Sequence, residues 1–173
     1  TYKIYDALFG LEEGVITPED SFIAWNGESY PFEAWNADQT LQSAMTSSVN
    51  WYFQSIDEQL ASTNIYNYIQ QIGYGNENVS GDLSTYWLES SLKISPVEQV
   101  ELLMKLQNNS LGFSSENINA VKDSICLSSS NTGKFYGKTG TGRVGGQDVN
   151  GWFIGYIETA DNTYFFATNI GAD

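Results

Sequence analysis

Three β-rich stretches in the C-terminal third decide the fold: residues 134–141 read KFYGKTGT, residues 150–158 read NGWFIGYIE, and residues 163–170 read TYFFATNI. Aromatic residues, threonine and isoleucine dominate these runs, and such residues favour strands. The pair Asp161-Asn162 gives a turn signal between the last two runs. The sequence therefore predicts a meander of antiparallel strands.

The chain before this meander is predicted to be mostly helical. Ile4, Leu8 and Leu11 recur at helical spacing near the start. We expect further helices over residues 41–60 with an interruption at 47–50, over 64–72, over 97–106 with Pro96 at the start, and over 117–127 after Ser114. A helical block packed beside a central antiparallel sheet is an α+β fold.

The composition suits one packed core. The chain has 173 residues, of which 41% are hydrophobic and 14% aromatic. No internal repeat or Pro-rich linker divides it, so we expect residues 1–173 to form a single domain. The first helical pattern starts without a preceding cap, and the last strand lacks a covering segment. We therefore expect this domain to be incomplete at both ends.

Charge and residue content exclude several functions. Seven Lys and Arg against 21 Asp and Glu give a net charge of -14, which repels phosphate backbones and anionic lipid heads. We expect no nucleic-acid partner and no membrane insertion, since no apolar run approaches the roughly 20 residues of a bilayer span. Histidine is absent and Cys126 is the single cysteine. A Ser-His-Asp triad and a thiolate metal site are thereby excluded, and we expect no metal.

The string with the clearest chemical meaning is Lys138-Thr139-Gly140, followed by Thr141, at the end of a predicted strand. A cation and a hydroxyl on an exposed strand edge can hold a carboxylate. The glycine lets a ligand approach the backbone closely. Read alone, the same string also suits a solvated turn.

Two further segments carry polar groups within apolar surroundings. Lys3 lies among Tyr2, Ile4 and Tyr5, and a desolvated lysine amine can act as a neutral base or accept an electrophile such as carbon dioxide. Ser48 and Asn50 place a hydroxyl and an amide inside an otherwise apolar helical pattern. Taken singly, a surface lysine and a helix N-cap are the plainer interpretations.

Together these segments resemble the serine penicillin-recognising enzymes, whose signature combines S-x-x-K, S-x-N-like and K-T-G elements. The corresponding strings are Thr1-Tyr2-Lys3, Ser48-Val49-Asn50 and Lys138-Thr139-Gly140. The nucleophilic serine of this pattern would immediately precede Thr1. The stretches 74–76 (YGN), 86–96 (YWLESSLKISP) and 150–156 (NGWFIGY) are similar to class D β-lactamases and to the extracellular sensor domains of β-lactam-responsive, Bla/Mec-type signal transducers.

The resemblance implies a transpeptidase-like fold, a ligand and a catalytic scheme. β-Lactam antibiotics would bind between the sheet and the helical block, and the serine would attack the lactam carbonyl. Lys3, often carboxylated by carbon dioxide in this family, would take the serine's proton, and Ser48 would relay a proton to the departing nitrogen. The backbone N–H of Thr141 would help hold the oxyanion. No cofactor is implied beyond carbon dioxide as a covalent lysine modification.

The resemblance also assigns substrate-binding and supporting roles. Lys138 and Thr139 would grip the substrate carboxylate, with Arg143 as a second candidate. Gly140 and Asn50 complete the expected substrate-binding set. Trp87 would donate its indole N–H to the carbamate on Lys3.

Three functions remain open at this point. The first is hydrolysis of β-lactams by a class D enzyme, and the second is a sensor that is acylated and only slowly deacylated. The residue type at Asn50 favours the sensor. Most class D hydrolases resemble Ser-x-Val at this element, with an apolar third residue, whereas the amide of Asn50 can hydrogen-bond Lys3 and favour its free amine.

The third function is a non-enzymatic carbohydrate- or peptide-binding module, in which exposed rings would stack on the ligand. The candidate rings are Trp25, Tyr30, Phe32 and Trp35. The acidic composition and single cysteine fit an extracellular or cell-surface domain of a Gram-positive type bacterium. The sequence does not indicate whether the protein is a monomer or an oligomer.

Overall fold

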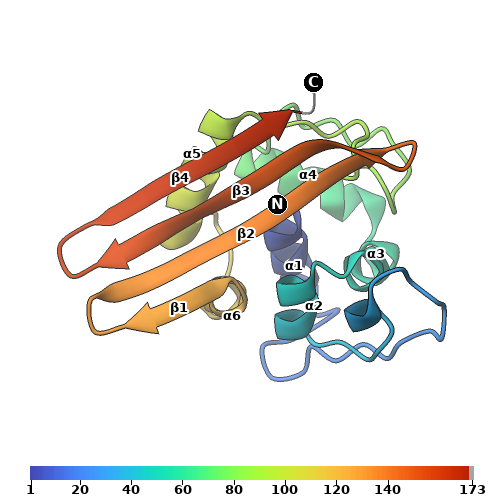
Figure 1. The fold of residues 1–173 in the computed structure, drawn as a ribbon, viewed down its shortest axis with the longest axis horizontal. Coiled ribbons are helices and arrows are strands. Elements are labelled where there is room, and N and C mark those ends of the chain that lie inside the picture. Colours follow the sequence, from blue (N-terminus) through green and yellow to red (C-terminus); the bar gives the residue numbers. More distant parts are fainter. Residues whose placement is uncertain (172–173) are drawn as a thin grey trace.

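The computed structural model describes residues 1–171, and its centre is a four-stranded antiparallel sheet (Figure 1). The strands lie in the sheet in their sequence order. They are β1 (Cys126–Ser130), β2 (Gly133–Val144), β3 (Gln147–Thr159) and β4 (Thr163–Gly171). Every neighbouring pair is antiparallel, so the predicted meander is confirmed.

Helices supply the rest of the regular structure: in Figure 1, α4 and α5 lie behind the sheet, whereas α2 and α3 lie below it on the right. Within residues 1–171 they are α1 (Lys3–Glu12), the 3-10 helix η1 (Glu33–Trp35), α2 (Leu41–Ser47), α3 (Asn50–Gln59), α4 (Ser62–Ile72), α5 (Pro96–Gln107) and α6 (Ser115–Ser124). Helix α5 contacts β3 and β4, while α1 contacts α2, α3 and α6. The predicted α+β class is confirmed.

The central helix is α1, and its burial fixes where the site can lie. Every residue from Lys3 to Leu11 is buried. A helix that is enclosed on all sides belongs to the interior of a protein. The two charged side chains near its start, Lys3 and Asp6, are therefore carried into the core.

The predicted interruption at 47–50 is confirmed. Helix α2 ends at Ser47, and α3 begins at Asn50. Between them Ser48 adopts a left-handed conformation with φ 54°, which is uncommon for a residue other than glycine. The break turns the chain and presents Ser48 to β2, where its hydroxyl meets Lys138.

One predicted boundary is wrong. The apolar residues Ile125 and Leu127 extend the helical pattern to residue 127, but α6 ends at Ser124 and Cys126 opens β1. Strand β1 carries little apolar alternation of its own and forms by pairing with β2. Tertiary pairing therefore overrides the local helical pattern.

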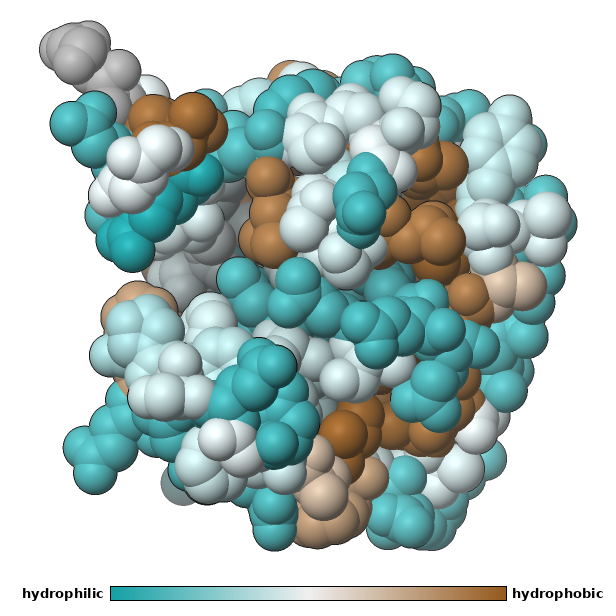
Figure 2. Space-filling view, turned by 90° about the vertical axis from the view of Figure 1, so that its right-hand side faces the viewer, coloured by the Kyte–Doolittle hydropathy of each residue, from teal (hydrophilic) through white to brown (hydrophobic). Residues whose placement is uncertain are grey.

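The surface agrees with the acidic, polar composition. The face drawn in Figure 2 is mostly polar, and its apolar patches remain separate from one another. No helix between residues 1 and 171 is long and apolar enough to cross a membrane. Residues 172 and 173 of the predicted domain range 1–173 lie outside the described residues.

Candidate active site

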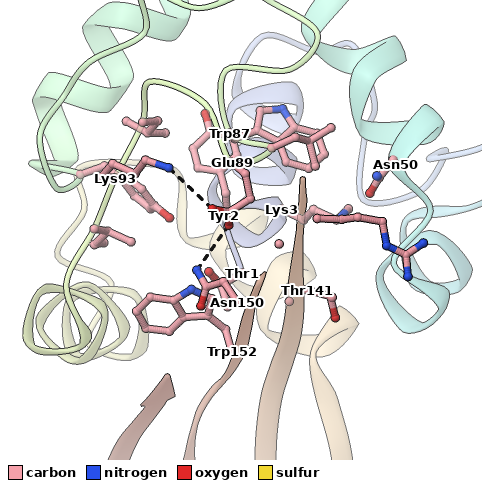
Figure 3. Close-up of a pocket in the computed structure, with 17 residues that line it drawn as sticks. Thr1, Tyr2, Lys3, Asn50, Trp87, Glu89, Lys93, Thr141, Asn150 and Trp152 are labelled. Atoms are coloured by element: carbon pink, nitrogen blue, oxygen red, sulfur yellow. Dashed lines mark hydrogen bonds and ion pairs between the residues drawn. The ribbon is translucent and has the colours of Figure 1, made fainter. Parts of the chain in front are cut away.

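Two adjoining cavities, of about 370 and 750 Å³, lie where α1, the start of α3 and the end of β2 meet. We refer to them together as the cleft. Both are lined by Lys3, Asn50, Gly140, Thr141 and Arg143, and Figure 3 shows the smaller one. Five predicted site residues from separate parts of the sequence therefore share one cleft.

Lys3 forms the buried wall of the cleft and is only 8% exposed. Its Nζ lies 4.8 Å from the centre of a Trp87 ring and 5.8 Å from the centre of the Phe53 ring. Burial, and then the charge of Lys138, lower the pKa of Lys3 from 10.5 to about 7, while Asp6 acts in the opposite direction. A large fraction of the amine is thus neutral at pH 7 and able to accept a proton.

Lys138 reaches the cleft from β2 and has polar partners. Its ammonium donates to Ser48 Oγ and, at 3.1 Å, to the carbonyl oxygen of Thr139. Burial lowers the pKa of Lys138 from 10.5 to about 8, which leaves it mostly charged at pH 7. Ser48 and Thr139 line the larger cavity together with Lys3. The structure thus brings the three sequence elements to one place.

Gly140 permits a close approach between β2 and the start of α1. A Cβ added at Gly140 would lie 2.8 Å from the backbone nitrogen of Thr1. Backbone cannot yield at that separation, so a side chain here would push the two elements apart. The Thr1 hydroxyl accepts a hydrogen bond from Gln99 Nε2 at 2.8 Å, which holds this end of α1 against α5.

Trp87 has one hydrogen-bond partner and one cation–π partner at the buried wall of the cleft. Its indole Nε1 donates to Asp57 Oδ2 at 2.9 Å, whereas Lys3 lies over the face of the indole. Asp57 takes the indole N–H in this arrangement, and the donation to a carbamate on Lys3 stays a prediction.

Asn50 and Arg143 both line the cleft. Within the described residues no hydrogen bond joins the side chains of Asn50 and Lys3. Arg143 Nε donates to Asp148 Oδ1 at 2.7 Å on the open surface. The guanidinium of Arg143 is therefore paired within the chain, which weakens its candidacy as a carboxylate anchor.

Sequence reasoning missed a polar bridge across the smaller cavity. Asn150 Nδ2 donates to Glu89 Oε1 at 3.3 Å, and Lys93 Nζ lies 3.7 Å from Glu89 Oε2 (Figure 3). A Cβ at Gly142 would fall 2.0 Å from Glu89 Oε1, so the missing side chain makes room for this carboxylate. The bridge links the 86–96 segment to the end of the sheet.

Two fully buried carboxyl groups were also missed. Asp6 follows Lys3 by three residues, a spacing that places both on one helical face, and this spacing was the available signal. Asp57 lies on α3 and accepts the Trp87 indole N–H. Nothing local in the sequence marks that pairing. In residues 1–171 no group of acidic or cysteine side chains is arranged to hold a metal.

The four rings considered for a binding module lie at the rim of the cleft and beyond it. Phe32 and Trp35 line the larger cavity, and Trp35 Nε1 donates to the carbonyl oxygen of Ser47 at 3.0 Å. Trp25 Nε1 donates to the carbonyl oxygen of Glu28. Tyr30 is tilted against Trp35. Tyr30 and Phe32 contact Trp35, whereas Trp25 and Phe32 remain 36% and 51% exposed.

Two lysines converge on one hydroxyl-lined cleft, one from a buried helix and one from a strand ending in K-T-G, and this arrangement defines the serine penicillin-recognising class. The chain belongs to the penicillin binding protein transpeptidase domain family, whose model matches residues 1–172. Both the class D β-lactamases and the β-lactam sensor domains have this fold.

Individual relatives refine this assignment. Regulatory protein BlaR1 of Bacillus licheniformis is 51% identical over 170 residues, which are 98% of this chain and 28% of that protein. The chain thus spans little more than a quarter of that relative. The solved C-terminal domain of the Bacillus licheniformis BlaR penicillin-receptor has a TM-score of 0.93 at 49% identity, covering 98% of this chain and 68% of that one.

A class D β-lactamase structure from Bacillus subtilis matches the fold equally well. Its TM-score is 0.93, at 37% identity, covering 99% of this chain and 71% of that one. The backbone therefore does not separate hydrolase from sensor, but the sequence identity is higher to the receptor. The comparisons favour the sensor, which stood second in the sequence analysis, over the hydrolase that stood first.

Proposed function

We propose that this chain is an extracellular β-lactam sensor domain, acylated on a serine preceding Thr1 and deacylated only slowly. The observation that carries the proposal is the buried Lys3 amine, with its pKa near 7, in one cleft with Ser48 and Thr139. The 51% identity to a regulatory protein, against 37% to a β-lactamase, supports sensing over turnover.

Acylation would begin with transfer of one proton. The serine Oγ attacks the lactam carbonyl carbon while neutral Lys3 Nζ takes the serine's proton. The carbonyl oxygen becomes an anion, held by backbone N–H groups that include that of Thr141. The tetrahedral species then collapses and the lactam C–N bond breaks.

The leaving nitrogen needs a proton, and Ser48 is placed to supply one. Its hydroxyl already accepts a hydrogen bond from the Lys138 ammonium. When Ser48 passes its proton to the nitrogen, Lys138 can replace it. Lys138 and Thr139 also present a cation and a hydroxyl to the carboxylate that most β-lactams carry.

The test is the lifetime of the acyl-enzyme. The chain, produced with its preceding serine, is mixed with excess benzylpenicillin, and the intact-protein mass is followed over time. We expect one adduct with the mass of intact penicillin, which persists for hours. Lys134→Met, an exposed lysine on β2, is the matched control and should label at the native rate.

Other outcomes decide between the alternatives. A transient adduct with many penicillins consumed per protein would establish a class D hydrolase instead. If no adduct forms in a folded protein that carries the serine, acylation itself is wrong and a binding module becomes the better explanation.

A further inference from the structure

A buried carboxylate next to the cleft controls the direction of the Trp87 side chain. Asp57 lies on α3 and is 0% exposed. It accepts the Trp87 indole N–H at 2.9 Å and the Tyr86 hydroxyl at 3.3 Å. Tyr86 is in turn hydrogen-bonded to Tyr2 beside Lys3. The two donors hold Asp57 in place and fix the plane of the indole.

Asp57 is the ionised member of a carboxyl pair. Burial raises the pKa of Asp57 to about 6, and hydrogen bonds from Trp87, Asp6 and Tyr86 oppose that rise. Burial, followed by the charge of Asp57, raises the pKa of Asp6 well above its usual value. No N–H or hydroxyl within residues 1–171 donates to Asp6. Burial and the neighbouring carboxylate thus favour the neutral form of Asp6, which leaves Asp57 as the member that carries the negative charge.

The opposite side of Trp87 meets Lys3. Lys3 Nζ lies over the ring at 4.8 Å, and the face of an indole carries partial negative charge. This contact stabilises an ammonium and gives nothing to an anion. The one polar donor of the indole points to Asp57, away from the amine.

A carbamate on Lys3 would need a hydrogen-bond donor, and the indole N–H of Trp87 is already bonded to Asp57. Neutral Nζ attacks the carbon of carbon dioxide, an N–C bond forms, one proton leaves the nitrogen, and an anionic carboxylate results. In a buried site that anion requires hydrogen-bond donors. Asp57 is not among the groups that shift the pKa of Lys3, so the contact between Asp57 and Lys3 runs through Trp87.

We propose that Asp57 is a positioning residue that captures the Trp87 indole N–H and thereby keeps Lys3 as a free amine. The proposal deepens the proposed sensor function and rests on it for its biological meaning. A sensor that lacks a carbamate also lacks the base that would activate water against the acyl-enzyme. Slow deacylation then follows from the Asp57–Trp87 hydrogen bond.

The experiment measures carbamate formation directly, by ¹³C NMR during titration with ¹³C-bicarbonate and without any penicillin. Two variants of Asp57 are compared. Asp57→Asn removes the charge but keeps an acceptor for Trp87, whereas Asp57→Ala removes both, and both relieve Asp6 of its charged neighbour equally. We expect the carbamate of Asp57→Ala to form with at least a tenfold lower apparent Kd for bicarbonate than that of Asp57→Asn, since a hydrogen bond to a charged group contributes about 1.5–3 kcal/mol.

A second substitution separates positioning from a merely structural role. Trp87→Phe keeps a ring face over Lys3 and loses the donor. In the Asp57→Ala background it should abolish the gain in carbamate affinity, whereas in the native protein it should change that affinity less than twofold. Equal bicarbonate affinities for folded Asp57→Ala and Asp57→Asn would overturn the proposal.

The remaining outcomes also give a decision. If Asp57→Ala does not fold, Asp57→Val fills more of the space and takes its place in the comparison. If neither variant folds, the single variant Trp87→Phe is measured instead. A tenfold weaker carbamate formation in Trp87→Phe would show that the indole N–H supports the carbamate despite Asp57, and would overturn the proposal. Because the NMR readout needs no acylation, failure of penicillin labelling would overturn the sensor function separately.

Discussion

Lys3 and Lys138 face the same cleft but lie in opposite kinds of surroundings. Lys3 comes from a fully buried helix and touches the faces of aromatic rings. Lys138 comes from a strand and donates to a hydroxyl and a carbonyl oxygen. Burial lowers the pKa of both, to about 7 for Lys3 and about 8 for Lys138.

The comparison shows how one residue type takes two roles. Burial lowers the pKa of Lys3, and no side chain or carbonyl within residues 1–171 accepts a hydrogen bond from its amine, so Lys3 is suited to accept a proton. An ammonium bonded to oxygen acceptors retains its charge, which suits Lys138 to an anionic ligand. Each charge also disfavours the other, because Lys138 is the second cause of the lowered pKa of Lys3.

Removing the base should have the largest effect. Lys3→Met keeps the length and apolar contacts of the side chain but removes the amine. General-base catalysis contributes about 10²- to 10⁴-fold, so we expect acylation by a fluorescent penicillin to slow by that factor. Lys134→Met is the control on the exposed surface. Native-rate labelling of Lys3→Met would assign the base to another group.

The next largest effect should come from the contact that holds the two lysines at their present spacing. A Cβ at Gly140 would meet the backbone nitrogen of Thr1, whereas a Cβ at Gly151 would lie 3.9 Å from its nearest neighbour. Small displacements of reacting groups can cost about 100-fold in rate, so Gly140→Ala should slow acylation by about 10- to 100-fold. Gly151→Ala, on the adjacent strand, should acylate normally. Equal rates for the two variants would show that this approach does not matter.

The sequence predicts the Lys138 side of the cleft better than the surroundings of Lys3. Strands β2 to β4 carry their own aromatic and β-branched patterns and were predicted nearly to their ends. Strand β1 was missed because Ser128, Ser129 and Ser130 give no apolar alternation and the strand exists through its pairing with β2. Ring contacts around Lys3 come from residues 50 and more positions away, and no local pattern reports them.

The same limit explains why the sequence does not predict the hydrogen-bond partner of Trp87. An indole near a lysine suggests a hydrogen bond between them, and the sequence alone offers no reason to prefer another acceptor. The preference arises because α1 and α3 pack together and bury Asp6 and Asp57 as a pair. In the sequence, Asp57 is one of 21 acidic residues, and nothing near it marks it as buried or as the acceptor for Trp87.

Removing the anchor should cost less than removing the base. Lys138→Met deletes the charged donor to the substrate carboxylate, and charge-assisted hydrogen bonds contribute about 1.5–3 kcal/mol. We expect the apparent Kd for penicillin, from the concentration dependence of acylation, to rise by about 10- to 100-fold. The pKa of Lys3 should rise as well, because the neighbouring charge is gone. An unchanged Kd would remove Lys138 from carboxylate binding.

The two lysines together predict a bell-shaped pH profile. Lys3 works as the neutral amine, so acylation should increase as pH rises through its pKa of about 7. Lys138 works as the ammonium, so acylation should decrease as pH rises through its pKa of about 8. The second-order rate constant of acylation should fall by about five- to tenfold at pH 6 and at pH 9 relative to its maximum. Lys138→Met should lack the alkaline limb, and persistence of that limb would assign it elsewhere.

Arg143 should contribute least, although it lines both cavities. Its guanidinium is paired with Asp148 on the exposed surface, and such pairs add little to stability or binding. We expect Arg143→Ala to raise the apparent Kd for penicillin by about threefold or less. This rise in Kd should be confined to low salt, where screening is weak. Asp148→Ala frees the guanidinium and is the matched variant. If that variant binds penicillin more tightly and Arg143→Ala binds it much more weakly, Arg143 turns toward the ligand on binding, and the anchor is shared between Lys138 and a second cation.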